Sequence, residues 1–294
     1  MDKVFRLWRP VEFTDSWRKC DTSVLDDIAP SWFARREISQ NTSTEFKEFL
    51  GRLKRKHAIE TGLIEQLYDL DKGVTETLIR EGFVASYLSH NDTNIPIPKL
   101  LGHLNDQLEA MDFVFDMVKE DRPLSKSFVR SLHQLLTRHQ DSAFGRNALG
   151  HPIEIPLLKG AFKVRPNNPT TKDGVKILYC PPEHVEAEMD NLITILNNVS
   201  KTEIHPLIIA SWLHYAFISI HPFQDGNGRT ARLLSSFILI QNGYFPFTVL
   251  REDLIGKYFY SLKQADKGNY QLLVNYIGSN QKNTIKKFCT KANI

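Results

Sequence analysis

The residues best suited to chemistry lie in one short run, 221–232, which reads His-Pro-Phe-Gln-Asp-Gly-Asn-Gly-Arg-Thr-Ala-Arg. His221 has an ordinary pKa close to neutrality, so it can accept a proton from a hydroxyl group at cellular pH. Asp225 offers the carboxylate oxygens that Mg²⁺ prefers, and this ion usually completes its shell with water and substrate phosphates. The run therefore pairs a base with a metal ligand, a combination suited to a reaction at phosphorus.

The second half of the run is suited to binding phosphates. The glycine-flanked turn at 226–228 can adopt backbone angles that are closed to most residues, so successive N–H groups can face one anion. A helix is expected to follow, and its N-terminus also favours phosphate. Arg229 and Arg232 share one face of that helix, where each guanidinium can bind a phosphate group. The predicted phosphate-binding residues are Gly226, Asn227, Gly228, Arg229, Thr230 and Arg232.

Each part of the run, taken alone, has a simpler structural explanation. A single histidine beside an apolar segment usually packs in the core or lies on the surface, and an Asn-Gly pair is usually just a turn. An arginine pair on a helix is usually a solvated face. Together, however, all the parts fit the same ligand, a nucleotide phosphate, and the simpler explanations give no reason for that agreement.

The run also resembles the signature of the Fic (Fido) family, His-x-Phe-x-Asp/Glu-Gly-Asn-Gly-Arg-x-x-Arg, and matches it at every defined position. The resemblance implies a protein adenylyltransferase, which moves the AMP part of ATP to a Ser, Thr or Tyr hydroxyl of a target protein. It implies ATP and Mg²⁺ as cofactors, with His221 as the base and Asp225 as the Mg²⁺ ligand. Arg229 would contact the β-phosphate and Arg232 the γ-phosphate, while Phe223 would anchor the loop in the core.

The composition is that of an ordinary globular chain. The 294 residues are 41% hydrophobic and 24% charged, and the net charge of +3 is too small to argue for binding nucleic acid or an anionic membrane. The three cysteines, Cys20, Cys180 and Cys289, are too far apart in the sequence to suggest a zinc site or a disulfide framework. The first residues lack the apolar core of a signal peptide, so we expect a cytoplasmic protein. The longest apolar stretch, 206–223, contains histidines and is expected to be a buried helix, not a membrane span.

Helical periodicity dominates the chain, so the predicted fold class is mainly α. The family resemblance implies a Fic-type helical bundle, and we expect an N-terminal helical region at 1–119, a Fic domain at 120–280 and a C-terminal tail at 281–294. Residues 1–43 are weakly patterned, but their aromatic side chains indicate a segment that packs against the rest of the chain. Thr75 is expected to cap a short helix. The main helices are predicted at 44–70, 99–119, 125–139 (capped by Ser125), 183–199, 204–219, 229–242, 251–267 and 269–286.

Residues 141–182 differ from the rest, being rich in Gly, Pro and Asn. Two β-like runs, at 161–164 and 175–179, are separated by turn sequences and predict a β-hairpin before the motif loop. Its turns are expected at 167–169 and 172–174. In Fic proteins a hairpin at this point, the flap, presents an extended target segment by β-strand addition. The residues that match the flap strand are Val175, Lys176, Ile177 and Leu178.

Three residues beyond the run, Tyr258, Phe259 and Asp266, fall where the family places adenosine contacts. Many family members have Asn at the position of Asp266. For the two aromatic residues core packing is an equally good explanation, because aromatic side chains at helical spacing are usually buried. Both interpretations stay open from the sequence.

Many Fic proteins also carry an inhibitory helix with the pattern Ser/Thr-x-x-x-Glu-Gly/Asn. Its glutamate pairs with the second arginine of the motif, and a carboxylate can compete with phosphate for one guanidinium. Glu81 matches the pattern strictly, whereas the sequence around Glu65 ends in Gln66. Because a helix precedes Glu65 and a break and a capped helix follow it, Glu65 is slightly favoured. Either residue could instead be a surface glutamate, with Gly82 simply ending its helix.

The predicted function is thus AMP transfer from ATP to a target protein, kept low by an inhibitory glutamate. Two alternatives in the same site are hydrolysis of AMP from a modified protein and transfer of another nucleotide. A third is a non-catalytic binding module, suggested by the basic residues Lys282, Lys286, Lys287 and Lys291. A second copy of the chain, forming a homodimer, is a further expected partner. Binding to a membrane or to nucleic acid does not fit the composition.

Overall fold

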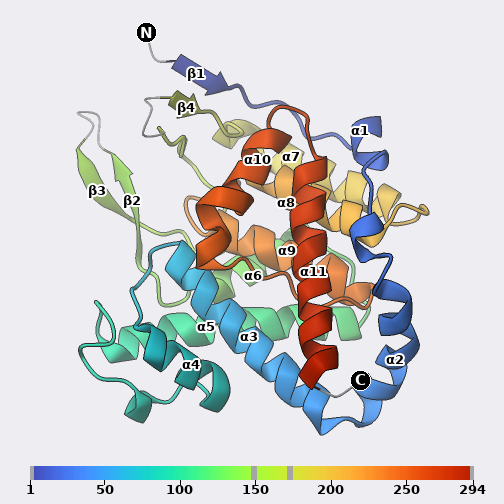
Figure 1. Ribbon diagram of the computed structural model, residues 1–294. Coiled ribbons are helices and arrows are strands. Elements are labelled where there is room, and N and C mark those ends of the chain that lie inside the picture. Colours follow the sequence, from blue (N-terminus) through green and yellow to red (C-terminus); the bar gives the residue numbers. More distant parts are fainter. Residues whose placement is uncertain (1–2, 147–150, 171–174, 292–294) are drawn as a thin grey trace.

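The computed structural model describes residues 3–146, 151–170 and 175–291. Most of them are helical, which confirms the predicted fold class (Figure 1). The helices are α1 (Asp15–Arg18), α2 (Ala29–Thr42), α3 (Thr44–Ile64), α4 (Lys72–Glu81), α5 (Ile97–Lys119), α6 (Lys126–Leu136), α7 (Pro182–Val199), α8 (Pro206–Ile220), α9 (Asn227–Gln241), α10 (Tyr260–Ala265) and α11 (Gln271–Lys291). The strands are β1 (Lys3–Arg6), β2 (Ser142–Arg146), β3 (Pro152–Pro156) and β4 (Val175–Ile177).

Two helices on either side of the motif loop form the centre of the molecule. α8 and α9 pack against each other, with α7 and α11 on α8 and with α5 and α6 on α9 (Figure 1). α8 begins at Pro206, whose fixed φ suits a first helical turn, and nearly all its side chains are buried. It is the buried helix that the apolar stretch predicted. Among the described residues, no helix is long and apolar enough to cross a membrane.

One of the two predicted helix caps is correct. The Ser125 hydroxyl caps α6 by accepting a hydrogen bond of 3.1 Å from the backbone of the first turn. The prediction that Thr75 caps a short helix is wrong, because that helix, α4, already begins at Lys72. The Asp71 carboxylate caps α4 instead, accepting a hydrogen bond of 2.7 Å from the N–H of Gly73.

The predicted β-hairpin is wrong in position, although the stretch 141–182 does contain a hairpin. β2 and β3 pair antiparallel there, ahead of the predicted strands. The segment 161–164 is not a strand, because it lies along the motif loop, where the N–H of Lys163 donates to the Pro222 carbonyl at 2.8 Å. The predicted turn at 172–174 lies outside the described residues.

The predicted flap strand is present but shorter than expected. β4 ends at Ile177, so Leu178 follows the strand. One edge of β4 pairs in parallel with β1, which lies near the N-terminus (Figure 1). The other edge meets residues 169–170, and the N–H of Ile177 donates to the Pro169 carbonyl at 3.0 Å. The flap strand is thus held on both sides.

The two ends of the described chain pack together. Trp17 stacks on Tyr270 with ring centroids 4.0 Å apart, and Trp32 makes an edge contact with Phe288 of α11. Both tryptophans are buried, which confirms that the N-terminal segment packs against the rest of the chain. α11 continues through residue 280 to Lys291 without a break. The predicted domain limits stay a prediction.

The single helix predicted at 251–267 is divided in three. A 3₁₀ turn (Arg251–Asp253) leads into a π-helical turn (Leu254–Phe259), which α10 follows. A π-helical turn is rare and occurs frequently at functional sites. This one carries Tyr258 and Phe259, two of the residues that the family resemblance assigned to adenosine.

Two glycines of α3 offer a matched test of how this helix packs. At Gly62 an added Cβ would lie 2.3 Å from the hydroxyl oxygen of Tyr68, which is buried. At Gly51 an added Cβ would meet Arg55 at 3.6 Å, an ordinary contact distance. We expect Gly62→Ala to lower the free energy of unfolding by about 1–3 kcal/mol, because overpacking outweighs the better helix propensity of alanine.

The control, Gly51→Ala, should raise the free energy of unfolding by roughly 0.5–1 kcal/mol, since only the helix propensity changes. Urea denaturation followed by circular dichroism measures both values. Equal stabilisation by the two substitutions would show that Tyr68 does not pack against α3 as described.

Candidate active site

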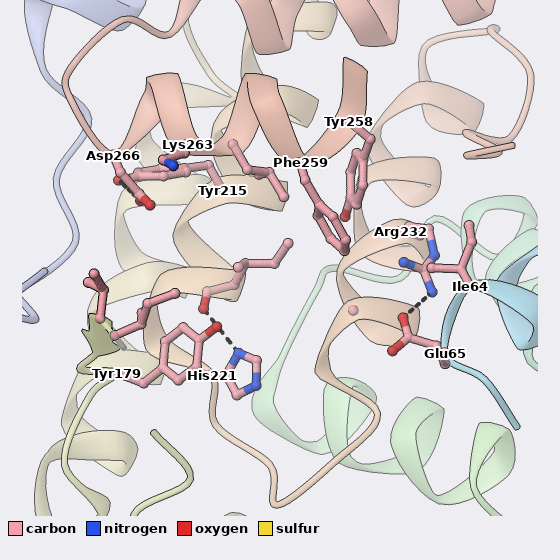
Figure 2. A pocket seen from close by; sticks show the side chains of 15 residues that line it. Ile64, Glu65, Tyr179, Tyr215, His221, Arg232, Tyr258, Phe259, Lys263 and Asp266 are labelled. Carbon is pink, nitrogen blue, oxygen red and sulfur yellow. Dashed lines mark hydrogen bonds and ion pairs between the residues drawn. The ribbon is translucent and has the colours of Figure 1, made fainter. Parts of the chain in front are cut away.

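A cavity of about 570 Å³ opens beside the motif loop, where the C-terminal end of α3, β4, α8, α9 and α10 meet. Figure 2 shows Arg232 and Glu65 at one end of it and Tyr215 and Asp266 toward the other, with His221 between them. The first turn of α9 also lines the cavity. A predicted base, a guanidinium and a helix start therefore share one space.

His221 ends α8 in a left-handed conformation (φ 53°, ψ 57°), which is uncommon for a residue other than glycine. Its N–H donates to the Phe217 carbonyl at 2.9 Å, which fixes this turn to the helix. The ring nitrogen Nδ1 lies 3.3 Å from the carbonyl oxygen of Ile218. Because a carbonyl oxygen only accepts hydrogen bonds, Nδ1 carries the hydrogen of the neutral ring and the lone pair is on Nε2. Nε2 is therefore the ring nitrogen that can accept a proton.

An aromatic side chain next to the flap strand fixes the orientation of the His221 ring. The ring of Tyr179 stacks on it with centroids 3.8 Å apart and planes 4° apart. Tyr179 lies two residues after β4, so a short segment connects the flap strand to the ring that stacks on the predicted base. A displacement of β4 is therefore expected to change the orientation of the His221 ring.

The motif loop is closed by the side chain of Asn227. Its amide accepts from the N–H of Phe223 and donates to the Phe223 carbonyl, both at 2.8 Å. Phe223 is buried and stacks on His133 at 3.7 Å, so it anchors the loop in the core as predicted. Gly226 has a φ of 78°, and an added Cβ would lie 3.1 Å from His133 Nε2. The positive φ favours glycine here, and a Cβ would make a tight contact with His133.

Asp225 presents an ionised carboxylate at the loop. Its Oδ1 accepts from the N–H of Gly226 at 2.7 Å and its Oδ2 from the Gln140 amide at 2.6 Å, while Arg229 lies 4.0 Å from Oδ2. Burial alone would raise the pKa of Asp225, but the Arg229 charge and the two hydrogen bonds hold that pKa below its ordinary value. In the described ranges no three acidic, His or Cys side chains gather into a metal site. A cation at Asp225 would therefore need phosphate and water oxygens, the set that suits Mg²⁺.

The two arginines of the motif differ in their surroundings. Arg229 is 1% exposed and donates from Nη2 to the Gln140 side-chain oxygen at 2.6 Å. Its Nε and Nη1 have no hydrogen-bond partner in the part of the chain that the structure describes. The Thr230 hydroxyl is also buried, donating to the Gly226 carbonyl at 2.9 Å. Both side chains therefore stabilise the motif loop through hydrogen bonds. Their phosphate-binding roles stay predictions.

Arg232 does line the cavity, and three side chains hold its guanidinium. Nη2 lies 2.6 Å from Glu65 Oε1, Nε donates to the Thr61 hydroxyl at 2.8 Å, and the Tyr258 hydroxyl is a further partner. Burial acts to lower the pKa of Arg232, but Glu65 and Tyr258 outweigh it and raise that pKa above its ordinary value. Because the Arg232 side chain is only 2% exposed, Glu65 balances a buried charge.

The structure brings Glu65, and not Glu81, to Arg232. Glu65 ends α3, and its carboxylate lies over the first turn of α9, where an added Cβ at Gly228 would be 2.6 Å from Oε1. Glu81 lies at the end of α4 and pairs with its neighbour Arg80 at 2.5 Å. Figure 2 shows Glu65 paired with Arg232, so its carboxylate occupies the guanidinium that was predicted to bind phosphate. An inhibitory role for it stays a prediction.

The residues assigned to adenosine lie along one wall of the cavity. Tyr258 is 2% exposed and its hydroxyl is 2.8 Å from His214 Nε2, so it is both a core residue and part of the wall. Phe259 is 49% exposed at the cavity edge. The Asp266 carboxylate accepts a hydrogen bond of 3.2 Å from the Tyr215 hydroxyl. The adenosine-binding roles of these residues stay predictions.

The flap residues alternate in their surroundings. Val175 and Ile177 line the cavity, whereas Lys176 between them is not a lining residue. This alternation follows from the two-residue period of a strand. Leu178 lies beyond the strand, so the part of the flap that forms a ladder is shorter than the sequence predicted.

Sequence reasoning missed three side chains of the site. Gln140 links Asp225 to Arg229, but no motif marks it, because only folding brings the end of α6 beside α9. Tyr179 is the last residue of the β-like run at 175–179 and could have been proposed as a ring partner. Tyr215 precedes the motif on the helix that ends at His221, and its helical spacing to Ile218 was a usable signal.

Comparisons with known proteins agree on one family. The Fic/DOC family model matches residues 123–239. A Caenorhabditis briggsae protein named protein adenylyltransferase fic-1 is 28% identical over 223 residues, which are 74% of this chain and 38% of that protein. The Caenorhabditis elegans protein of the same name is 35% identical over 107 residues, 36% of this chain and 21% of that protein. The chain thus spans well under half the length of these relatives.

The fold itself is found in a solved structure, a Fic domain containing signaling protein from Bacteroides thetaiotaomicron. The TM-score is 0.72 at 23% identity, and the alignment covers 90% of this chain and 96% of the other. The residues matched by the family model include the whole run 221–232 and the helices α6 to α9 around it, apart from the last residues of α9. Residues 123–239 of the chain therefore match the Fic/DOC family model, and this match contains the whole run 221–232.

Proposed function

We propose that this protein transfers AMP from ATP to a hydroxyl side chain of a target protein, and that Glu65 keeps the resting activity low. One observation carries the proposal. His221, with its lone pair on Nε2, shares a single cavity with Arg232 and with the first turn of α9. The names of the curated relatives, protein adenylyltransferases, support the same reaction.

The triphosphate would lie on the first turn of α9. The N–H groups of a first helical turn have no partners within the helix and favour an anion. Gly228 leaves room for close approach there, and Arg232 would bind the γ-phosphate. Adenosine would then extend along Phe259 toward Asp266. A cavity of about 570 Å³ fits a ligand of this size, since small-molecule sites are roughly 300–1,000 Å³.

Mg²⁺ would be held by Asp225 together with phosphate oxygens and water. Gln140 orients this carboxylate, and Arg229 keeps it ionised. When bound, the cation would neutralise negative charge on the departing pyrophosphate.

The transfer step follows from the tautomer of His221. Nε2 accepts the proton of the target hydroxyl while its oxygen bonds to the α-phosphorus, and the bond from that phosphorus to the bridging oxygen breaks to release pyrophosphate. The Ile218 carbonyl, 3.3 Å from Nδ1, stabilises the positive ring that forms. Tyr179 holds the ring plane, so positioning supplies part of the rate.

The target segment would pair with β4 through backbone hydrogen bonds, as in β-strand addition. Val175 and Ile177 face the cavity from this strand. A segment added at the strand edge would therefore lie next to His221. Backbone pairing of this kind is largely independent of target sequence, which fits a strand with no strongly charged cluster.

Glu65 would oppose ATP in two ways. Its carboxylate forms an ion pair with Arg232 and so neutralises the charge that would bind phosphate. It also fills the space over Gly228. Couplings between competing ligands are typically about 1–3 kcal/mol, or roughly 5–150-fold in affinity. Removal of the Glu65 side chain should therefore raise transfer by an amount in this range.

The base is tested by His221→Asn in a Glu65→Gly chain. Asparagine tolerates a left-handed backbone but cannot act as a base near neutral pH. We expect AMP transfer to fall by about 10²–10⁴-fold, with unchanged affinity for ATP. Label from α-labelled ATP on protein measures transfer, and calorimetric titration measures binding. His90→Asn, on an exposed loop, is the control; transfer that survives in the His221→Asn chain would refute the assignment.

The inhibitory residue is tested by comparing Glu65→Gly with Glu81→Gly. Glu65→Gly should increase protein-bound label by roughly 5–150-fold, because Arg232 becomes available to phosphate. Glu81→Gly removes the other candidate, which pairs with the surface residue Arg80, and should leave transfer at the level of the unsubstituted chain. A larger increase in the Glu81→Gly chain, or none in either, would contradict the role given to Glu65.

A further inference from the structure

The flap strand β4 has two edges, and the chain itself covers both. On one edge the N–H of Ile177 donates to the Pro169 carbonyl at 3.0 Å, and Lys176 bridges Thr170. On the other edge β1 pairs in parallel, with Lys3 opposite Val175, Val4 opposite Lys176 and Arg6 opposite Ile177. Figure 1 shows β1 beside β4 near the top of the view. A target segment that adds to β4 must therefore take the place of β1 or of residues 169–170.

The two covers are not equivalent. Residues 169–170 lie only a few positions before β4, so they belong to the flap itself. β1 comes from the far end of the described chain and contributes only a four-residue strand, and a lone pair of short strands is marginally stable in water. The β1 edge is thus the one that a target segment can enter.

The segment that occupies this edge cannot accept AMP. Residues 3–13 read Lys-Val-Phe-Arg-Leu-Trp-Arg-Pro-Val-Glu-Phe and contain no Ser, Thr or Tyr. The first hydroxyl, on Thr14, lies at the N-terminus of α1, well past the strand. β1 therefore has the backbone of a bound target and lacks the group that reacts.

The chain holds this segment in place by contacts just beyond the strand. Trp8 stacks on His184 at 5.7 Å. The N–H of Val11 donates to the Glu188 carboxylate at 2.9 Å, and its carbonyl accepts from Asn191 at 3.1 Å. With Trp8 and Val11 anchored on α7, β1 is kept near β4 at an effective concentration on the order of millimolar. A target must compete with that concentration.

We propose that β1 is a pseudosubstrate strand, which covers the target edge of β4 until a hydroxyl-bearing extended segment displaces it and pairs in the same parallel direction. The inference rests on the proposed function, because it takes β4 as the strand that presents the target. It adds a second control, independent of Glu65. Glu65 opposes the nucleotide, whereas β1 opposes the target.

The test measures binding of a fluorescein-labelled peptide with the sequence of residues 3–13, by fluorescence polarisation without nucleotide. The full chain is compared with a Val4→Pro/Phe5→Pro chain, in which two adjacent residues of β1 lose the N–H that a ladder needs. Leu7→Pro is the control, since Leu7 is exposed and follows the strand. We expect the peptide to bind the double-proline chain at least tenfold more tightly than the full chain or the Leu7→Pro chain, because the edge is free.

A further variant shows where the peptide binds. Successive residues of a strand direct their N–H groups to opposite edges. The N–H of Ile177 points to Pro169, so that of Lys176 lies on the β1 edge. Adding Lys176→Pro to the double-proline chain should abolish peptide binding, and a peptide that itself carries the two prolines should not bind.

Three results would overturn the proposal: equal affinity of the peptide for all chains, no binding to the double-proline chain, or binding that survives Lys176→Pro. Thermal melting by circular dichroism checks that the variants are folded. Hydrogen exchange in the unsubstituted chain gives a separate measurement, since rapid exchange at every one of residues 4–6 would also refute a paired β1. None of these results depends on AMP transfer, so they are separate from a failure of the proposed function.

Discussion

Arg232 places a charged guanidinium in the interior of the protein, on the helix that follows the motif loop. A buried charge is stable only when an opposite charge and hydrogen-bond partners compensate for its lost hydration. Thr61 and Tyr258 provide hydrogen bonds, and Glu65 provides the negative charge at 2.6 Å. Two buried histidines nearby, His57 and His214, do not compete for this role. Their pKa values are lowered to about 3, chiefly by burial, with the charge of Arg232 acting in the same direction, so both rings stay neutral. The cavity is thus built around a cation that requires an anion, which can be Glu65 or a phosphate.

This requirement explains how the N-terminal part of the chain relates to the motif. α3 must end where its last carboxylate reaches Arg232, and the close fit of Gly62 to Tyr68 fixes that end of the helix. The flap is tied to the same cavity from the other side, because Tyr179 stacks on His221. Segments that precede the motif by more than a hundred residues therefore cover both places where ligands would bind. Glu65 lies over the proposed phosphate position, and β1 lies along the strand that would present a target. Under the proposed function, ATP and target would each displace an internal substitute.

The sequence was sufficient for the parts that local chemistry determines. The run 221–232, the buried helix before it and the Ser125 cap all follow from residue type and spacing. The hairpin was misplaced because β-propensity cannot tell a strand from an extended segment, and 161–164 lies along the motif loop where a backbone hydrogen bond to Pro222 holds it. The choice between Glu65 and Glu81 could not be made from the pattern, since Glu81 fits it more strictly and only tertiary packing brings Glu65 to Arg232. Gln140 and the pairing of β1 with β4 depend on long-range contacts that leave no periodic signal.

The central claim is that Glu65 and the γ-phosphate of ATP compete for the Arg232 guanidinium. A crystal structure of the Glu65→Gly chain with Mg²⁺ and a non-hydrolysable ATP analogue tests it most directly. We expect the γ-phosphate to lie within hydrogen-bonding distance of the Arg232 guanidinium, with the phosphates on the first turn of α9 and the α-phosphorus facing Nε2 of His221. Phosphates bound away from Arg232, or a guanidinium that turns to another carboxylate of the protein, would contradict the view that Glu65 stands in for ATP.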